Sequence, residues 1–234
     1  MDIKYDIFLE GSTIDLCIPT EEIAYESDWY SWFNQKKINK FLVQGTFPNT
    51  REQQKRFFQE ESASGKRLIL LIVTKGGVLK GVISLSKIDF RSSTAELALV
   101  IDDKIERKTS RLASLEAVAL ITEHGFEVMH LDRISAGQSR LLEGWQRRME
   151  LLGYRVEGVH KNTFYESREK KGNTVTIACN YEDYKKVIGA RGKLFDNEGP
   201  MLKRIKEMTG ISVASRLETF LYDIENEYYH DLWK

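Results

Sequence analysis

A glutamate inside an apolar strand is the side chain of this chain best placed to accept a proton. The segment 95–101 reads Ala-Glu-Leu-Ala-Leu-Val-Ile, and period-two alternation places Glu96, Ala98 and Val100 on one face. We expect apolar surroundings there, which make a carboxylate a stronger base, acting directly or through a water. The alternative interpretation is a strand-end acid paired with a lysine or an arginine.

A second carboxylate, Asp89, lies at the end of the preceding predicted strand. It could hold an amine-bearing substrate, although an aspartate before the segment 90–93, Phe-Arg-Ser-Ser, is equally typical of a turn. No histidine, cysteine or carboxylate cluster has the spacing of metal ligands, so we expect no metal site. Cys17 and Cys179 stand far apart in apolar segments and are expected to be core residues.

Four cations stand at or just before the start of a predicted helix: Lys104, Arg107, Lys108 and Arg111. The N-terminus of a helix attracts phosphate through its free N–H groups and its dipole, and cations add charge-assisted hydrogen bonds. Ser110 and Ser114 could also bond a phosphate, or could simply cap the helix. The segment therefore predicts an anion site, with a solvated basic surface loop as the alternative.

The overall composition is that of an ordinary globular protein. The chain has 234 residues, of which 41% are hydrophobic and 30% charged, and its formal net charge is zero. Zero net charge provides no broad positive field for nucleic acid. The sequence shows no N-terminal signal pattern and no apolar run that could span a bilayer. We therefore expect a cytoplasmic protein without nucleic-acid or membrane partners.

Hydrophobic periodicity predicts strands that first form hairpins and later alternate with helices. The predicted strands are 14–18, 68–73, 78–88, 95–101, 131–135, 154–159, 164–168 and 174–178. The predicted helices follow an N-cap at Thr20 and then cover 51–62, 112–126, 141–152, 181–188, 198–208 and 213–230. This order predicts a mixed α/β (α+β) sheet with helices on both faces. We expect a domain at 1–188 and a C-terminal helical extension at 189–234.

The order strand, loop, helix, strand, helix between residues 96 and 158 resembles the acyl-CoA-binding half of the GNAT superfamily of N-acetyltransferases. Segments 115–118 and 131–134 are similar to its helix start and its fifth strand. Segment 149–158, Met-Glu-Leu-Leu-Gly-Tyr-Arg-Val-Glu-Gly, resembles the family pattern Y-E-K-L-G-F-x-x-E-G. The resemblance covers roughly residues 12–185 and implies a GNAT-like fold.

The resemblance also implies acetyl-CoA as co-substrate. The family polarises the thioester carbonyl with a backbone N–H of the strand before the loop, which corresponds to Leu99, Val100 and Ile101. Its pyrophosphate loop, Q/R-x-x-G-x-G/A, corresponds to residues 108–113. The remaining residues implied to bind the cofactor are Arg107, Lys108, Ser110, Arg111, Leu112, Ala113 and Ser114.

Two positions depart from the family pattern. Arg111 stands where the loop has its middle glycine, so that cations would replace part of the backbone contact to phosphate. Met149 stands where many members carry a tyrosine, proposed as the acid that protonates the CoA thiolate, and methionine has no proton to give. Either another group serves as the acid or the thiolate leaves unassisted.

The N-terminal half resembles one bacterial branch of the superfamily. Segments 30–34, 39–41 and 47–50 are similar to the opening of acetyltransferases of nucleotide-linked amino sugars and of ribosomal-protein N-termini. We expect Trp32 and Asn34 to face the substrate together with Asp89. Phe57 and Phe58 are expected in the core, because aromatic residues at helical spacing usually pack there.

The function implied by the resemblance is an acetyl-CoA-dependent N-acetyltransferase that acts on a primary amine. The acceptor that best fits the branch is a nucleotide-linked amino sugar used for surface polysaccharide. The alternatives are a protein N-terminal acetyltransferase and a catalytically inactive domain that binds acyl-CoA, which the two departures would favour. Apolar spacing in the C-terminal extension predicts packing on the domain or on a second subunit, which leaves a homodimer open.

Overall fold

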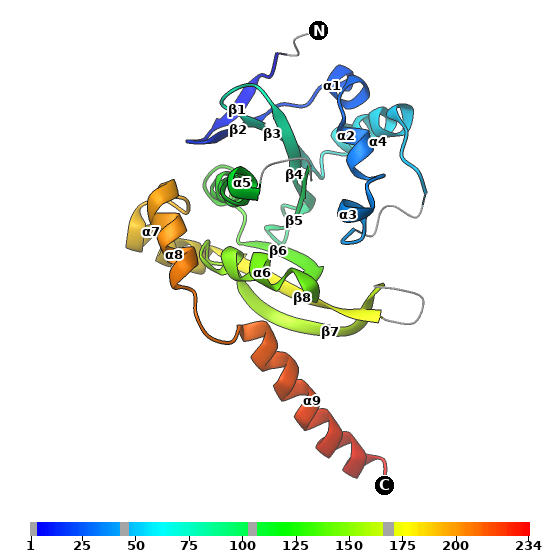
Figure 1. Cartoon of the computed structure of the whole chain (residues 1–234), viewed down its shortest axis with the longest axis vertical. Helices are drawn as coiled ribbons and strands as arrows, with labels where there is room; N and C mark the ends of the chain where they lie inside the picture. Colours follow the sequence, from blue (N-terminus) through cyan, green and yellow to red (C-terminus); the bar gives the residue numbers. More distant parts are fainter. Residues whose placement is uncertain (1–3, 43–46, 103–106, 166–170) are drawn as a thin grey trace.

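The computed structural model describes residues 4–42, 47–102, 107–165 and 171–234, and for 107–111 and 165 it describes the backbone alone. Strands and helices alternate along the described chain (Figure 1). The strands are β1 (Ile7–Glu10), β2 (Ile14–Cys17), β3 (Leu68–Thr74), β4 (Leu79–Asp89), β5 (Thr94–Ile101), β6 (Arg133–Ser139), β7 (Arg155–Tyr165) and β8 (Lys171–Asn180).

Helices occur in both halves of the described chain. They are α1 (Glu21–Glu26), α2 (Trp29–Trp32), α3 (Lys36–Asn39), α4 (Arg51–Ser64), α5 (Arg107–Glu127), α6 (Glu143–Glu150), α7 (Tyr181–Arg191), α8 (Glu198–Glu207) and α9 (Val213–Leu232). A short 3₁₀ turn, Arg140–Leu142, precedes α6. The predicted mixed α/β fold is confirmed.

The strands form one mixed sheet in the order β1-β2-β3-β4-β5-β6-β8-β7. All neighbouring pairs are antiparallel except β5 and β6, which are parallel. The β5–β6 ladder is short, because its pairs run only from Thr94↔Arg133 to Glu96↔Ser135. Beyond Glu96 the two strands have no ladder contact. The sheet is therefore open along one seam near its middle.

Helices cover both faces of the sheet, as predicted, and each face has its own core. The long helix α5 packs on β2, β4 and β5, and its Leu115, Val118 and Ile121 are fully buried in the larger core. On the opposite face, α1, α2 and α4 enclose Trp29 and Trp32 against β2, β3 and β4. Burial of side chains of this size supplies most of the driving force that holds the helices on the sheet.

The two N-terminal helix starts predicted from the sequence are confirmed. Thr20 accepts a hydrogen bond from Ile23 N at 3.2 Å. Thr50 forms a capping box with Gln53, because each side chain bonds the other residue's backbone N–H, at 3.2 Å and 2.9 Å. The helix after Thr20 is broken, however, because Ser27 is extended and α2 starts again at Trp29. Because of this break, the aromatic residues after Thr20 do not lie along one continuous helix.

Several predicted boundaries are wrong. β1 was not predicted, and the strand expected at 154–159 continues to Tyr165 as one long β7 whose register shifts twice against β8. Of the strand expected at 164–168, residues 166–168 lie outside the described residues. β6 extends to Ser139, and helix α5 starts at residue 107 instead of 112. The strand segments that were missed carry polar residues, so a hydrophobic pattern does not reveal them. They are strands because their backbones pair with neighbouring strands, which the sequence does not display.

The C-terminal segments differ in how they pack. Leu194, Phe195 and Met201, around the start of α8, are buried in the larger core. Helix α9 contacts β7, where Lys161 pairs with Glu225, and extends away from the sheet (Figure 1). Only Ala214 of α9 is buried. The division of the chain at 188/189 remains a prediction.

Candidate active site

The open seam between β5 and β6 is the feature that builds the candidate site. In a regular sheet the facing edges would bond each other, whereas here residues 97–101 of β5 have no partner strand on the β6 side. Helix α5 runs behind the seam, and its Val118 lies at the bottom. At the seam, the β5 backbone after Glu96 has no strand partner on the side that faces β6.

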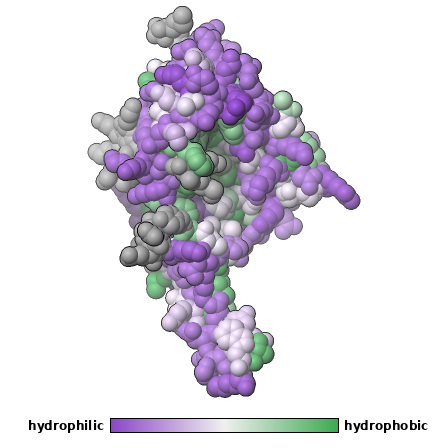
Figure 2. Space-filling view, turned by 90° about the vertical axis from the view of Figure 1, so that its right-hand side faces the viewer, coloured by the Kyte–Doolittle hydropathy of each residue, from purple (hydrophilic) through white to green (hydrophobic). Residues whose placement is uncertain are grey.

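A cavity of about 690 Å³ lies at this seam. It is lined on one side by residues 97–100 of β5 and on the other by Ala136, Gly137 and Gln138 of β6. The space-filling view shows apolar side chains at the bottom of a hollow, surrounded by polar surface (Figure 2). Leu142, Trp145 and Met149 close one end, which we call the β6 end.

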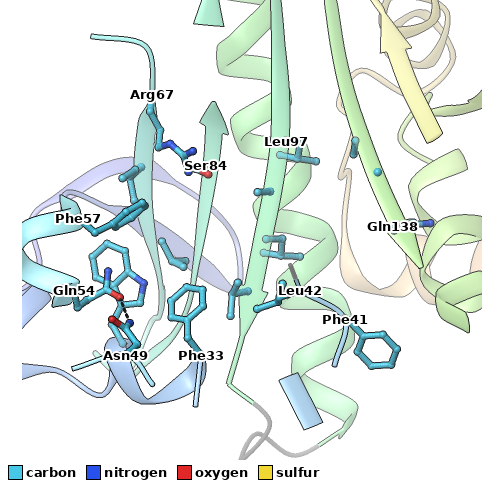
Figure 3. Close-up of a pocket in the computed structure, with 18 of the residues that line it drawn as sticks. Phe33, Phe41, Leu42, Asn49, Gln54, Phe57, Arg67, Ser84, Leu97 and Gln138 are labelled. Atoms are coloured by element: carbon cyan, nitrogen blue, oxygen red, sulfur yellow. Dashed lines mark hydrogen bonds between the residues drawn. The ribbon is translucent and has the colours of Figure 1, made fainter. Parts of the chain in front are cut away.

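The other end, which we call the α4 end, lies between β3, β4 and β5 and the helices α2 and α4. Paired residues in antiparallel strands point to the same face, so Ile69, Ser84 and Ala98 face this end together. The described residues that line it from the helices and their loops are mainly aromatic or amide-bearing: Trp29, Phe33, Phe47, Asn49, Gln53, Gln54 and Phe57. Figure 3 shows Phe57, Gln54 and Asn49 on this side, with Arg67 and Ser84 coming from the strands.

A chain of side-chain amides fixes the α4 end. Asn34 holds the backbone of Asn49 at both ends, since its Nδ2 donates to Asn49 O at 2.8 Å and its Oδ1 accepts from Asn49 N at 2.7 Å. Asn49 Nδ2 in turn donates to Gln54 Oε1 at 2.9 Å (Figure 3). This network connects the loop before α4 to the cavity wall. The buried Gln54 is therefore held in one orientation.

Arg67 supplies the one charged side chain among the described residues that line the cavity. Its guanidinium lies over the Phe57 ring, 5.6 Å from the ring centre, and its Nε is 2.7 Å from a carboxylate oxygen of Glu61. Stacking and the ion pair hold the planar group at the wall. Arg67 and Phe57 were not predicted as site residues, because an arginine at a strand start and a helix phenylalanine have no distinctive pattern.

Glu96, the predicted base, lies outside the lining of this cavity. Its side chain is 48% exposed and forms an ion pair with Lys87 at 2.9 Å. The expectation of apolar surroundings is therefore wrong, although alternation does place Glu96 on the same face as Ala98. The physical reason is position: Glu96 sits where the β5–β6 ladder ends, near solvent, and the apolar part of β5 begins after it.

Asp89 forms the turn that was its alternative interpretation. It accepts hydrogen bonds from Arg91 N at 2.9 Å and from Ser92 Oγ at 2.8 Å. These bonds, with that of Ser92 the largest, lower the pKa of the Asp89 carboxyl. The residue does not line the cavity. Its binding role stays a prediction for which this geometry offers no support.

Two aromatic residues, Trp32 and Phe57, have the opposite locations to those predicted. Trp32 is buried in the smaller core and does not line the cavity, while Phe57 does line it and is partly exposed. Phe58 packs beside Trp29, with ring centres 6.2 Å apart, as expected for a core residue. Trp29 belongs to the same core, but Trp29 and Phe33 also line the cavity, whereas Trp32 does not. Asn34 acts through Asn49 and lies outside the lining.

The predicted cofactor residues divide into two groups. Leu99 and Val100 line the cavity, with Ile101 following on the same open edge of β5. Leu112 and Ala113 are buried in the larger core and Ser114 is buried as well. Because α5 starts at residue 107, its free N–H groups belong to 107–110 and not to 112–114. The side chains of Arg107, Lys108, Ser110 and Arg111 lie outside the described residues, as does Lys104.

Met149 is buried and lines the β6 end of the cavity. Tyr154, the nearest phenol in the sequence, is buried elsewhere and bonds Thr122 Oγ1 at 2.8 Å, and burial raises the pKa of its hydroxyl. The described lining contains no aspartate, glutamate, histidine, tyrosine or lysine. Within the described residues, the cavity wall therefore offers no side chain suited to exchange a proton near neutral pH.

Both cysteines are buried core residues, as predicted. Burial raises the pKa of the Cys17 thiol to about 11 and that of Cys179 to about 12. Over the described part of the chain, no group of three or more His, Cys, Asp or Glu side chains could hold a metal ion. None of the helices in that part is long and apolar enough to cross a membrane.

Comparison with known proteins agrees with this architecture. A family model described as an acetyltransferase (GNAT) domain matches residues 21–155. This match covers more than half of the chain, and the chain belongs to that family. It is an acetyl-CoA-dependent acetyltransferase by family, which the resemblance of the sequence also implied. No curated protein matches the chain.

The solved structures with a similar fold include two acetyltransferases. The spermidine N-acetyltransferase of Vibrio cholerae, solved in complex with CoA and spermine, has a TM-score of 0.65 and 12% identity, and the match covers 75% of this chain and 99% of that one. A GCN5-related N-acetyltransferase from Brucella melitensis has a TM-score of 0.61 and 19% identity, and the match covers 81% and 85%. At these identities the likeness concerns the fold alone.

Proposed function

We propose that this protein transfers the acetyl group of acetyl-CoA to a primary amine. The observation that carries the proposal is the cavity at the open β5–β6 seam, which joins an apolar β6 end to an amide-lined α4 end. Two reactants could occupy the two ends of the cavity and meet at β5. Holding both in one site converts a bimolecular reaction into an effectively unimolecular one.

The residues fit acetyl-CoA in three respects. The seam exposes the backbone of Leu99 and Val100, and a free N–H there would polarise the thioester carbonyl. The apolar walls formed by Val118, Trp145 and Met149 suit an uncharged chain that carries the thioester. The start of α5 provides free N–H groups for the pyrophosphate.

Proton transfer in this site depends on the substrate and water. With Met149 at the β6 end and no titratable acid or base in the described lining, the amine binds neutral or loses its proton to solvent. The thiolate leaves with a proton from water or unassisted. A weakly basic amine that is neutral near pH 7 would therefore be favoured.

For the acceptor we propose an amino sugar linked to a nucleotide, used for surface polysaccharide. The α4 end supports this class, because aromatic rings can stack on a flat base and amides and an arginine can bond sugar and phosphate oxygens. A protein N-terminus is the alternative acceptor, and acyl-CoA binding without catalysis is the other outcome.

The test measures CoA release with a thiol reagent while acetyl-CoA is supplied with three kinds of amine. These are nucleotide-linked amino sugars, peptides with free N-termini and polyamines. We expect turnover with the first kind. Turnover with peptides alone would favour the N-terminal acetyltransferase, and binding of acetyl-CoA without turnover of any amine would favour the inactive domain.

A further inference from the structure

Trp29 and Gln54, at the α4 end of the cavity, belong to the buried residues with an N–H group that has no hydrogen-bond acceptor. Gln138 in the β6 wall and Trp32 in the smaller core, outside the cavity, are others. Trp29 is 1% exposed and Gln54 2% exposed, and both line the cavity. Trp29 Nε1 and Gln54 Nε2 lack a partner among the residues that the structure describes. Leaving a buried donor unsatisfied costs about 1–3 kcal/mol, so such groups are rare unless something binds them.

The surrounding bonds determine that both groups donate. An indole N–H has no lone pair to accept with. Asn49 Nδ2 donates to the backbone carbonyl of Tyr30 at 3.4 Å as well as to Gln54, which identifies it as the nitrogen. The atom of Gln54 that receives this bond must be the oxygen. Its amino group is therefore the end left without a hydrogen-bond partner.

The charge of the α4 end also favours a ligand that carries oxygen atoms. No aspartate or glutamate is present among the described lining residues, and Arg67 is the charged group there. Glu61, which pairs with Arg67, is not part of the lining. A polyamine needs carboxylates to replace the water around its ammonium groups. This wall instead offers N–H donors and a guanidinium, which suit oxygen atoms.

We propose that Trp29 and Gln54 form an oxygen-binding pair that selects the acceptor molecule. The acceptor is then an amine that also carries carbonyl, carboxylate, hydroxyl or phosphate oxygens, and polyamines are poor substrates. The inference rests on the proposed function, because it describes the acceptor of the same cavity. The inference goes beyond the proposed function because it names the side chains that select the acceptor, Trp29 and Gln54, and the amines that they disfavour, which are polyamines.

Binding can be tested without turnover by nuclear magnetic resonance. In the ¹⁵N-labelled protein saturated with acetyl-CoA, the Trp29 indole signal is assigned by its loss in Trp29→Phe. The probes are UDP-glucosamine, glucosamine, spermidine, and the matched pair 6-aminohexanoate and hexylamine. We expect oxygen-bearing amines to shift this indole signal, and hexylamine and spermidine to leave it unchanged. Absence of a shift with every oxygen-bearing probe at millimolar concentration overturns the proposal, whether or not the protein is catalytic.

Substitution of the glutamine tests the same pair by kinetics. Gln54→Glu preserves shape and the bond from Asn49 but replaces the donor by a carboxylate. We expect kcat/KM for the oxygen-bearing amine to fall about tenfold or more through KM, and the relative use of spermidine to rise. Gln59→Glu is the matched control, since Gln59 is an exposed glutamine of α4 that lies outside the cavity lining.

The outcomes separate the inference from the function. Turnover that favours spermidine in the unchanged protein, or an unchanged substrate ratio in Gln54→Glu, overturns the inference and leaves acetyl transfer intact. Where Gln54→Glu fails to fold by circular dichroism, Trp29→Phe supplies the kinetic test with the same expected loss. No turnover with any amine removes the proposed function, and the indole shift then decides the inference.

A second, independent observation concerns helix α9. One side of it holds to the domain, since Glu218 pairs with Arg140 at 3.2 Å, Glu225 pairs with Lys161, and Lys161 lies over the Tyr222 ring. A different stripe of the helix is apolar and largely exposed. Its members are Val213, Leu217, Phe220, Leu221, Ile224, Tyr228 and Leu232, with Ile224 at 44% and Phe220 at 57% exposure.

We infer that this stripe binds a second copy of the same chain. An antiparallel pair of α9 helices centred near Ile224 would place Arg216 of one copy near Asp231 of the other, twice by symmetry. Apolar residues then face each other along the stripe, and opposite charges meet at its ends.

Light scattering after gel filtration tests the second inference. We expect twice the 27.1 kDa chain mass for the unchanged protein and a single chain mass for Ile224→Glu. Asn226→Glu, an exposed position on the other side of α9, is the control and should keep the double mass. A chain-mass particle at micromolar concentration, or a double mass retained in Ile224→Glu, overturns this arrangement.

Discussion

Two buried polar regions of this molecule differ in how completely their hydrogen bonds are satisfied. In the turn between β1 and β2, the Glu116 carboxylate of α5 accepts from the backbone and hydroxyl groups of both Ser12 and Thr13. Glu116 is 2% exposed, yet four donors surround its charge. At the α4 end of the cavity, Trp29 and Gln54 are equally buried and each retains an N–H without acceptor.

The two regions therefore differ in role: the bonds of Glu116 stabilise the fold, and the donors at the α4 end are suited to bind a ligand. A buried carboxylate with a full set of donors connects the first hairpin to α5, so its bonds are already used and contribute to folding. Unsatisfied buried donors instead destabilise the fold, and a ligand that bonds them would recover this cost. Changes in the first region should therefore alter unfolding, and changes in the second should alter kinetics.

The largest effect is expected from Glu116→Ala. The substitution leaves two backbone N–H groups and two hydroxyls of the turn without their acceptor, and each unsatisfied group costs about 1–3 kcal/mol. We expect the free energy of unfolding to fall by about 3 kcal/mol or more, measured by urea denaturation. Glu60→Ala, an exposed position on α4, should change it by less than about 0.5 kcal/mol. A loss in Glu116→Ala no larger than the control would mean that water replaces the carboxylate.

Neutralising the start of α5 should alter cofactor binding and leave folding unchanged. Charge-assisted contacts to phosphate are worth about 1.5–3 kcal/mol each, so the triple change of Arg107, Lys108 and Arg111 to Ala should raise the Kd for acetyl-CoA about 100-fold or more. Titration calorimetry measures the Kd. Lys203→Ala with Lys206→Ala on α8 is the control for lost positive charge. An unchanged Kd in the triple variant would identify the segment as a solvated basic surface.

Asn34→Ala tests whether the amide network orients the cavity wall. It removes both bonds that hold Asn49, which in turn holds Gln54. We expect the KM for the amine to rise about three- to tenfold, with an unchanged Kd for acetyl-CoA, because roughly one hydrogen bond of about 1 kcal/mol is lost at the donor pair. Asn39→Ala removes a bond to Phe33 O at 3.2 Å in the same region and should leave the KM unchanged. Equal effects of both substitutions would show a general loosening instead.

The smallest effect is expected from Glu96→Gln. Because Glu96 is half exposed and paired with Lys87 outside the cavity lining, we expect kcat to fall less than about tenfold between pH 6 and 9. Lys87→Met should have a similarly small effect. A fall of about 100-fold or more for Glu96→Gln alone would establish it as the general base, acting through a water at the cavity edge.

Much of the fold was determined by local sequence. The capping residues Thr20 and Thr50 fix two helix starts through bonds within one turn, and the apolar runs of β3, β4 and β5 read directly as strands. The order of these elements was enough to indicate a mixed sheet and the acetyltransferase family. Such features depend on neighbours in the chain, which the sequence displays.

The content of the site was decided by the tertiary structure. Glu96 and Trp32 have the right types for a base and a substrate contact, yet one lies beside Lys87 in solvent and the other in the smaller core. Gln54, Arg67 and Phe57 line the cavity without any distinctive spacing. The reason is geometric: the end of the β5–β6 ladder and the break before α2 set which side chains meet, and both depend on contacts between residues far apart in the chain.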